Sequence, residues 1–162
     1  MASSAPPTPV AKADPARRFA IAVSRFNAHI TDGLLNGARA CLAEAAVTDA
    51  QVTVVQVPGA FELPLVAQRL ARSGAYDAVV CLGCLIKGDT MHFEYIAHAC
   101  TTGLAQVALD TGIPVAFGVL TTLDEAQAVA RAGEGRENKG WEATQAALEM
   151  VAVLARLDAV SE

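Results

Sequence analysis

Several side chains that could bind or transform a small molecule follow short apolar runs with the character of buried strands. They are Phe26 and Asn27 after the run at 19–23, Phe61 and Glu62 after the run at 52–57, and Asp89, Thr90 and His92 after the run at 78–82. In open parallel sheets, ligands bind outside the carboxyl ends of the strands. The sequence therefore predicts a binding site built from these strand-end segments.

The segment after the third run is the most informative. Gly88-Asp89-Thr90 precedes a predicted helix, whose first backbone N–H groups could receive an anion. His92 begins that helix, and an imidazole there could transfer protons near neutral pH. The alternative is a solvated histidine at a helix start.

The other strand-end residues also have simpler interpretations. Phe26 and Phe61 could be ordinary core aromatics. Glu62 could be a favourable charge in the first turn of a helix. At this point both interpretations stay open for each residue.

The predicted elements alternate along the chain. Brief apolar runs predict strands at 19–23, 52–57, 78–82 and 115–120, and 83–92 is predicted as a loop. Helical spacing predicts helices at about 30–45, 63–71, 93–108 and 139–157, and a capping box at Thr122–Glu125 predicts a short helix to about 132. Continuously apolar strands alternating with helices indicate an α/β protein. We expect a three-layer, flavodoxin-like fold, a four-stranded parallel sheet with helices on both faces.

Composition restricts the function. The 162 residues carry a net charge of −5, and the acidic pI of about 5.1 argues against a nucleic-acid binder. Hydrophobic residues make up 53% of the chain, yet no run is long enough to span a membrane. Residues 1–17 are proline-rich and are predicted to be a flexible N-terminal segment, followed by a single domain at 18–162. No secretory signal is evident, and four cysteines suit a reducing compartment, so a cytoplasmic protein is expected.

Other motifs are incomplete. Cys81-x-x-Cys84 has redox spacing, but it spans the end of a predicted buried strand and not a helix N-terminus. No second pair of ligands lies near it for zinc. Gly133-x-Gly135 lacks the third glycine of a dinucleotide fingerprint, and no Walker A sequence is present.

The strand-end motifs together resemble the 6,7-dimethyl-8-ribityllumazine synthase family of riboflavin biosynthesis. The matching pieces are Ser24-Arg-Phe-Asn27, Val57-Pro-Gly-Ala-Phe-Glu62, Gly88-Asp-Thr-Met-His-Phe93, Phe117-Gly-Val-Leu-Thr121, Arg131-Ala-Gly133 and Asn138-Lys-Gly140. They cover roughly residues 18 to 157 in the family's order. Lys87 stands where the family often has arginine, and Cys84 where it often has threonine or another small residue.

The resemblance implies a condensation without metal or organic cofactor. The family joins 5-amino-6-(D-ribitylamino)uracil to 3,4-dihydroxy-2-butanone 4-phosphate, with loss of phosphate and water. Such steps need positioned partners more than a strong nucleophile, so proximity should supply most of the rate.

The resemblance also implies a role for each site residue. Phe26 would stack on the pyrimidine, Ala60, Phe61 and Glu62 would line the ribityl chain with help from Asn27, and Cys84, Leu85 and Ile86 would offer backbone hydrogen bonds. Asp89 and Thr90 would bind phosphate, and His92 would transfer protons. Phe117, Arg131 and Lys139 would complete the site from a neighbouring subunit, with Arg131 on the phosphate.

The family assembles as pentamers, in some members as an icosahedral shell of pentamers. The short stretch between Gly133 and Asn138 resembles shell-forming members, so a shell is expected here. Riboflavin synthase is a candidate protein partner. Two other functions stay open: a flavodoxin-like module that binds a flavin or nucleotide, and a structural shell protein.

Overall fold

A computed structural model describes residues 9–161 of the chain. Within them the strands are β1 (Phe19–Ser24), β2 (Val52–Val57), β3 (Ala78–Ile86) and β4 (Val115–Thr122). The helices are α1 (Ala28–Glu44), α2 (Leu63–Arg72), α3 (His92–Thr111), α4 (Glu125–Arg131) and α5 (Lys139–Val160). Two short 3-10 helices, Asp49–Gln51 and Ala60–Glu62, precede β2 and α2.

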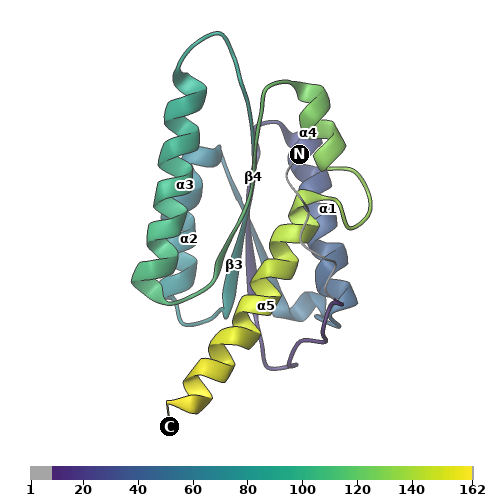
Figure 1. The fold of residues 1–162 in the computed structure, drawn as a ribbon, viewed down its shortest axis with the longest axis vertical. Coiled ribbons are helices and arrows are strands. Elements are labelled where there is room, and N and C mark those ends of the chain that lie inside the picture. Colours follow the sequence, from purple (N-terminus) through teal and green to yellow (C-terminus); the bar gives the residue numbers. More distant parts are fainter. Residues whose placement is uncertain (1–8, 162) are drawn as a thin grey trace.

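The strands form one parallel sheet in the order β2-β1-β3-β4. Helices α2 and α3 cover one face, and α1, α4 and α5 lie on the other (Figure 1). The predicted α/β architecture, a four-stranded parallel sheet between two layers of helices, is confirmed. All four strands point the same way, so their carboxyl ends share one edge of the molecule.

Each face of the sheet buries its own apolar cluster, because successive side chains of a strand point to opposite faces. Phe19 and Ile21 of β1 pack with α1 and α5, including Leu34. Ala20 of β1 packs with α2 and α3 on the other side, including Leu63. This two-sided burial explains why the central strands β1 and β3 are continuously apolar over most of their length.

The structure corrects two predicted boundaries. β3 does not end at Leu82 but continues to Ile86, because β4 pairs with it through Ile86↔Thr122. The segment 83–86, predicted as loop, is therefore strand. Thr122 does not cap α4; it ends β4, and the Asp124 side chain accepts a hydrogen bond from Gln127 N at 2.8 Å instead.

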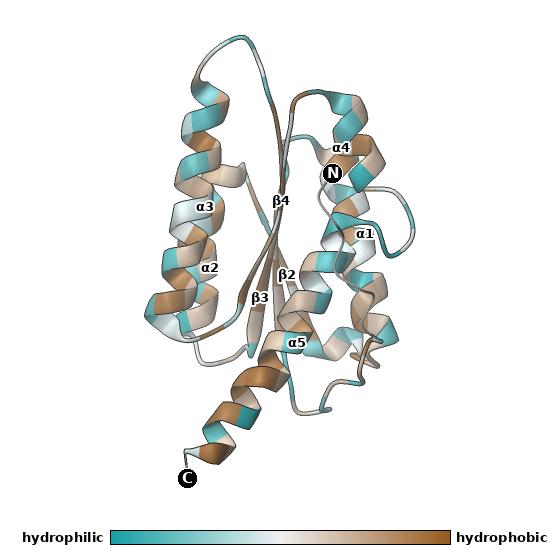
Figure 2. Ribbon diagram, in the orientation of Figure 1, coloured by the Kyte–Doolittle hydropathy of each residue, from teal (hydrophilic) through white to brown (hydrophobic). Residues whose placement is uncertain are grey.

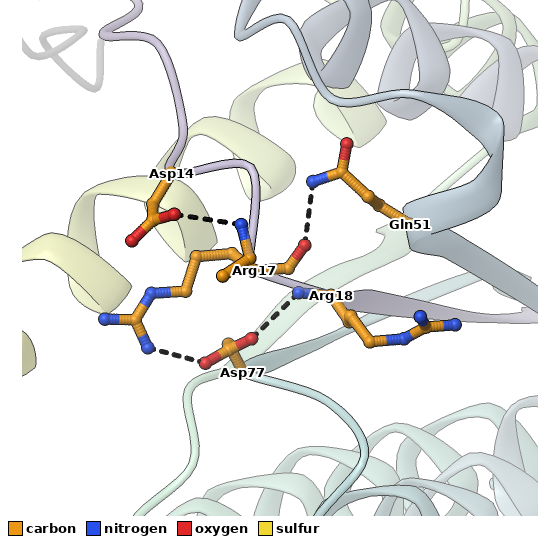
Figure 3. Close-up of polar contacts among 6 residues, drawn as sticks. Asp14, Arg17, Arg18, Gln51 and Asp77 are labelled. Carbon is orange, nitrogen blue, oxygen red and sulfur yellow. Dashed lines mark hydrogen bonds and ion pairs between the residues drawn. The ribbon is translucent and has the colours of Figure 1, made fainter.

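Residues 9–17 lead into β1, and Val10 and Ala13 pack against the apolar cluster between the sheet, α1 and α5. Arg17 Nη1 lies 2.7 Å from Asp77 Oδ1, and Asp77 Oδ2 accepts a hydrogen bond from the Arg18 backbone N–H (Figure 3). Gln51 Nε2 donates to the Arg17 carbonyl at 2.9 Å. Residues 1–8 of the predicted flexible segment lie outside the described residues, and the domain boundary at residue 18 stays a prediction.

The last turns of α5 project beyond the sheet and carry many hydrophobic residues (Figure 2). Leu157 is 58% exposed and Val160 is 85% exposed there. In the described part of the chain, no helix is both long and apolar enough to cross a membrane. Considerable apolar surface thus remains open on a single copy.

Candidate active site

A cavity of about 570 Å³ lies at the carboxyl ends of β1, β2 and β3. Most of the predicted site residues line it: Phe26, Asn27, Ala60, Phe61, Glu62, Cys84, Leu85, Ile86, Thr90 and His92. We call this the strand-end cavity. The structure thus brings together residues from three segments that are far apart in the sequence.

The β1–α1 junction places Phe26 at the mouth of this cavity. The Arg25 backbone N–H donates to Val57 O at 2.8 Å, and that of Phe26 donates to Pro58 O at 3.2 Å. The buried Thr31 hydroxyl donates to Ser24 O at 2.8 Å, which fixes the start of α1. The Phe26 ring is 68% exposed, so its interpretation as a core aromatic is wrong.

The β2–α2 junction presents the second aromatic. A single 3-10 turn, Ala60–Glu62, follows Pro58-Gly59 and leads directly into α2. Phe61 is 57% exposed, so it is not a core residue either. Glu62 lines the cavity and also lies at the amino end of α2, so both of its interpretations fit this position.

The β3–α3 segment supplies the third part of the cavity lining. Lys87 N donates to Thr122 O at 2.9 Å, and the chain then turns away until α3 begins at His92. The imidazole of His92 is exposed and lines the cavity. Asp89 lines neither this cavity nor the one described next, although Gly88 and Thr90 on either side of it line the strand-end cavity. Lys87 pairs with Glu94 in the first turn of α3, at 3.2 Å between Nζ and Oε1.

The remaining predicted residues, Phe117, Arg131 and Lys139, line a second cavity of about 410 Å³ formed by β4, α4 and α5. We call this the β4 cavity. Phe117 is 42% exposed on the edge strand. Within one chain the structure does not bring these three residues into the strand-end cavity.

Asn138 directly precedes Lys139, and its side chain holds the segment between α4 and α5. The Nδ2 of Asn138 donates to the carbonyls of Gly33 at 2.9 Å and Gly133 at 2.7 Å. Its Oδ1 accepts from the backbone N–H of Gly140 at 2.8 Å, which caps α5. This buried amide therefore ties α5 to α1 and fixes one wall of the β4 cavity.

Among the residues that line the two cavities, Phe93, Ile96 and Glu142 were not predicted as site residues. Phe93 and Ile96 were assigned to the packed face of a helix, yet both line the strand-end cavity. Glu142 lines the β4 cavity, and its two carboxylate oxygens lie 2.8 and 2.6 Å from Lys139 Nζ. The i, i+3 spacing of this acid and base on a helix was the signal that could have indicated the pair.

The cysteines form no reactive pair. All four thiols, including Cys81 and Cys84, are free and buried. Burial raises the pKa of Cys84 and of Cys100 to about 11 and that of Cys41 to about 12, and burial also raises the pKa of Cys81. In residues 9–161, no group of three or more His, Cys, Asp or Glu side chains is placed to hold a metal ion.

A protein-family model described as 6,7-dimethyl-8-ribityllumazine synthase matches residues 16–155 of the 162-residue chain. The match includes every strand of the sheet and all the residues named above for both cavities.

The four buried thiols should be protected from modification in the folded protein. At pH 7.5 the folded protein should react with a disulfide reagent such as DTNB far more slowly than a free thiol, because only the thiolate is nucleophilic and burial keeps these groups protonated. In guanidinium chloride four thiols per chain should react at once. Fast modification of Cys84 in the folded state would contradict this description of the cavity wall.

Proposed function

The chain belongs to the 6,7-dimethyl-8-ribityllumazine synthase family, and on that premise we propose that it is a transferase that condenses 5-amino-6-(D-ribitylamino)uracil with 3,4-dihydroxy-2-butanone 4-phosphate. The product would be 6,7-dimethyl-8-ribityllumazine, in the penultimate step of riboflavin biosynthesis. The observation that carries the proposal is the gathering of the predicted pyrimidine, ribityl and proton-transfer residues around one cavity of about 570 Å³.

In the proposed reaction the substrate's primary amine attacks the ketone and forms an imine with loss of water. Phosphate then leaves, and the second amine closes the ring with loss of another water. His92 would move protons between the amine, the departing oxygen atoms and solvent. No step needs a metal or an organic cofactor, so the main contribution of the protein is to hold the two substrates together.

The strand-end cavity offers a surface for each part of the pyrimidine substrate. The exposed ring of Phe26 would stack on the heterocycle, and the edge of β3 at Cys84 and Ile86 would supply backbone hydrogen bonds. The backbone groups of Leu85 face β4 instead, so Leu85 would contribute only to the lining of the cavity. Glu62 would accept hydrogen bonds from ribityl hydroxyls, beside Ala60 and Phe61. Asn27 has its Oδ1 left for a substrate hydroxyl, because its Nδ2 already donates within the protein.

The phosphate substrate would lie near Thr90 and the backbone N–H of Asp89, whose carboxylate then points away. The guanidinium of Arg131 matches the geometry of phosphate oxygens, and it lines the β4 cavity with Lys139 and Phe117. We propose that these three residues complete the site from a neighbouring copy, because in one chain they line a cavity of their own.

The chain would assemble into pentamers, and the pentamers into an icosahedral shell. Exposed apolar residues support this assembly. Leu65 on α2, Tyr95 and Leu109 on α3 and Val129 on α4 are all more than half exposed in the single chain. The four buried free thiols support a reducing compartment, for which we propose the cytoplasm. A partnership with riboflavin synthase stays a prediction from the family resemblance.

The reaction itself is the first test. Purified protein mixed with both substrates should form the lumazine, followed by its absorbance and fluorescence, faster than the spontaneous condensation. No acceleration would contradict the proposal. Tight flavin binding in that case would favour a flavodoxin-like binding module.

Two variants test the assigned roles separately. His92→Ala should lower kcat by about tenfold to a hundredfold, because proton transfer is only part of the rate enhancement. Arg131→Ala should raise the KM for the phosphate substrate by about tenfold or more, because it removes a charge-assisted hydrogen bond.

Arg72→Ala, which removes an exposed arginine that lines neither cavity, is the control and should leave both constants unchanged. Negligible effects from both His92→Ala and Arg131→Ala would mean that the site has been misplaced.

The assembly is tested by size-exclusion chromatography with light scattering. We expect a particle far larger than a pentamer at all protein concentrations, because a closed shell buries the apolar surface described above. A single peak at the mass of a pentamer across those concentrations would exclude the shell.

A further inference from the structure

Asn27 has a backbone conformation that most residues avoid. It lies in the left-handed region, with φ 57° and ψ 47°, between β1 and α1. Its side chain makes no capping hydrogen bond to α1, although asparagine is a preferred capping residue. Instead Nδ2 donates to the carbonyl oxygen of Cys84 in β3, at 3.0 Å.

This hydrogen bond lies just beyond the point where the pairing of β1 with β3 ends. The pairing of β1 with β3 ends at Val23↔Leu82, and the chain then leaves β3, with Arg25 N bonded to Val57 O. The pairing of β3 with β4 continues to Ile86. The end of β3 therefore projects past β1 by several residues.

The direction of the β3 backbone groups follows from two hydrogen bonds at the ends of its pairing with β4. Val79 N and Lys87 N both donate toward β4, to Pro114 O and Thr122 O at 2.9 Å each. Backbone groups of successive residues in a strand alternate between its two edges, so those of Cys84 and Ile86 face the side of β1. The Asn27 amide therefore makes the hydrogen bond to Cys84 O that a backbone N–H of β1 would make if the two strands stayed paired.

We propose that Asn27 is a positioning residue of the strand-end cavity. Its side-chain amide replaces the hydrogen bond that a longer β1 would make to β3, and it thereby holds the end of β3. It also fixes the adjacent Phe26 ring for the pyrimidine substrate. This inference rests on the proposed function. Without the amide, the Cys84 carbonyl would be a nearly buried acceptor without its partner. The β3 edge and Phe26 are then free to shift relative to each other, and the pyrimidine loses its binding surface.

Asn27→Asp is the sharpest test, because it keeps the shape and the Oδ1 acceptor for a substrate hydroxyl but replaces the Nδ2 donor to Cys84 with a second acceptor oxygen. We expect the KM and the dissociation constant for the pyrimidine substrate to rise by about tenfold. The KM for the phosphate substrate should stay within about twofold of wild type. Calorimetric titration with the pyrimidine substrate alone gives the dissociation constant without turnover.

Asn27→Gly removes the amide while favouring the left-handed backbone, and it is used where the aspartate variant folds poorly. A rise at least as large is expected for it, because it also removes the Oδ1 acceptor. Asn36→Asp, the same chemical change at an exposed position of α1, is the matched control and should behave as wild type.

The outcomes separate the two proposals. Wild-type affinity and KM in the two Asn27 variants would overturn the positioning role and leave the proposed function intact. A fall in apparent kcat with both KM values unchanged would mean a purely structural role and would also overturn it. A wild-type protein that neither binds the pyrimidine nor accelerates the condensation would refute both.

Discussion

The site depends on a difference in strand length at the centre of the sheet. β3 pairs with β4 as far as Ile86, whereas its pairing with β1 ends at Leu82. Because all strands are parallel, this step lies on the edge where the β1–α1, β2–α2 and β3–α3 segments meet. The step leaves an open strand edge beside the exposed rings of Phe26 and Phe61. A small heterocycle bound at this edge would therefore meet backbone hydrogen-bonding groups on one side and an aromatic face on the other.

The rest of the molecule holds that edge in place. Two apolar clusters pack helices against both faces of the sheet. The buried side chains of Thr31 and Asn138 form hydrogen bonds that stabilise the starts of α1 and α5, the helices that begin beside the two cavities. The division into two cavities has a functional consequence. Phe26 and His92 lie in one cavity, while Arg131 and Lys139 lie in the other, with Glu142 paired to Lys139. On the proposed function the two cavities would be two halves of one site, and the exposed apolar residues would allow copies of the chain to bring the halves together.

Much of the fold could be predicted from periodicity alone, because a strand buried on both faces must be continuously apolar. The boundaries that failed depend on tertiary contacts. Residues 83–86 begin with a glycine, which weakens a strand, and they extend β3 because β4 pairs with them. Thr122 matched a capping box locally, but pairing with Ile86 keeps it in β4. The strand-end rule correctly predicted that the segments after β1, β2 and β3 lie together, although Asp89 does not line the strand-end cavity. That this cavity is a binding site stays a prediction. No local pattern could show that Phe117, Arg131 and Lys139 line a separate cavity, or that the Asn27 amide bonds to a carbonyl 57 residues away.

The proposed function requires that the strand-end cavity of one copy and the β4 cavity of another form one catalytic site. Co-expression of two inactive chains tests it directly, one carrying Phe26→Ala and His92→Ala and the other Arg131→Ala and Lys139→Ala. If the halves come from different copies, random mixed assemblies should recover about a quarter of the wild-type activity, since each half of a site is intact in half of the copies. Activity no greater than that of either variant alone would contradict the account.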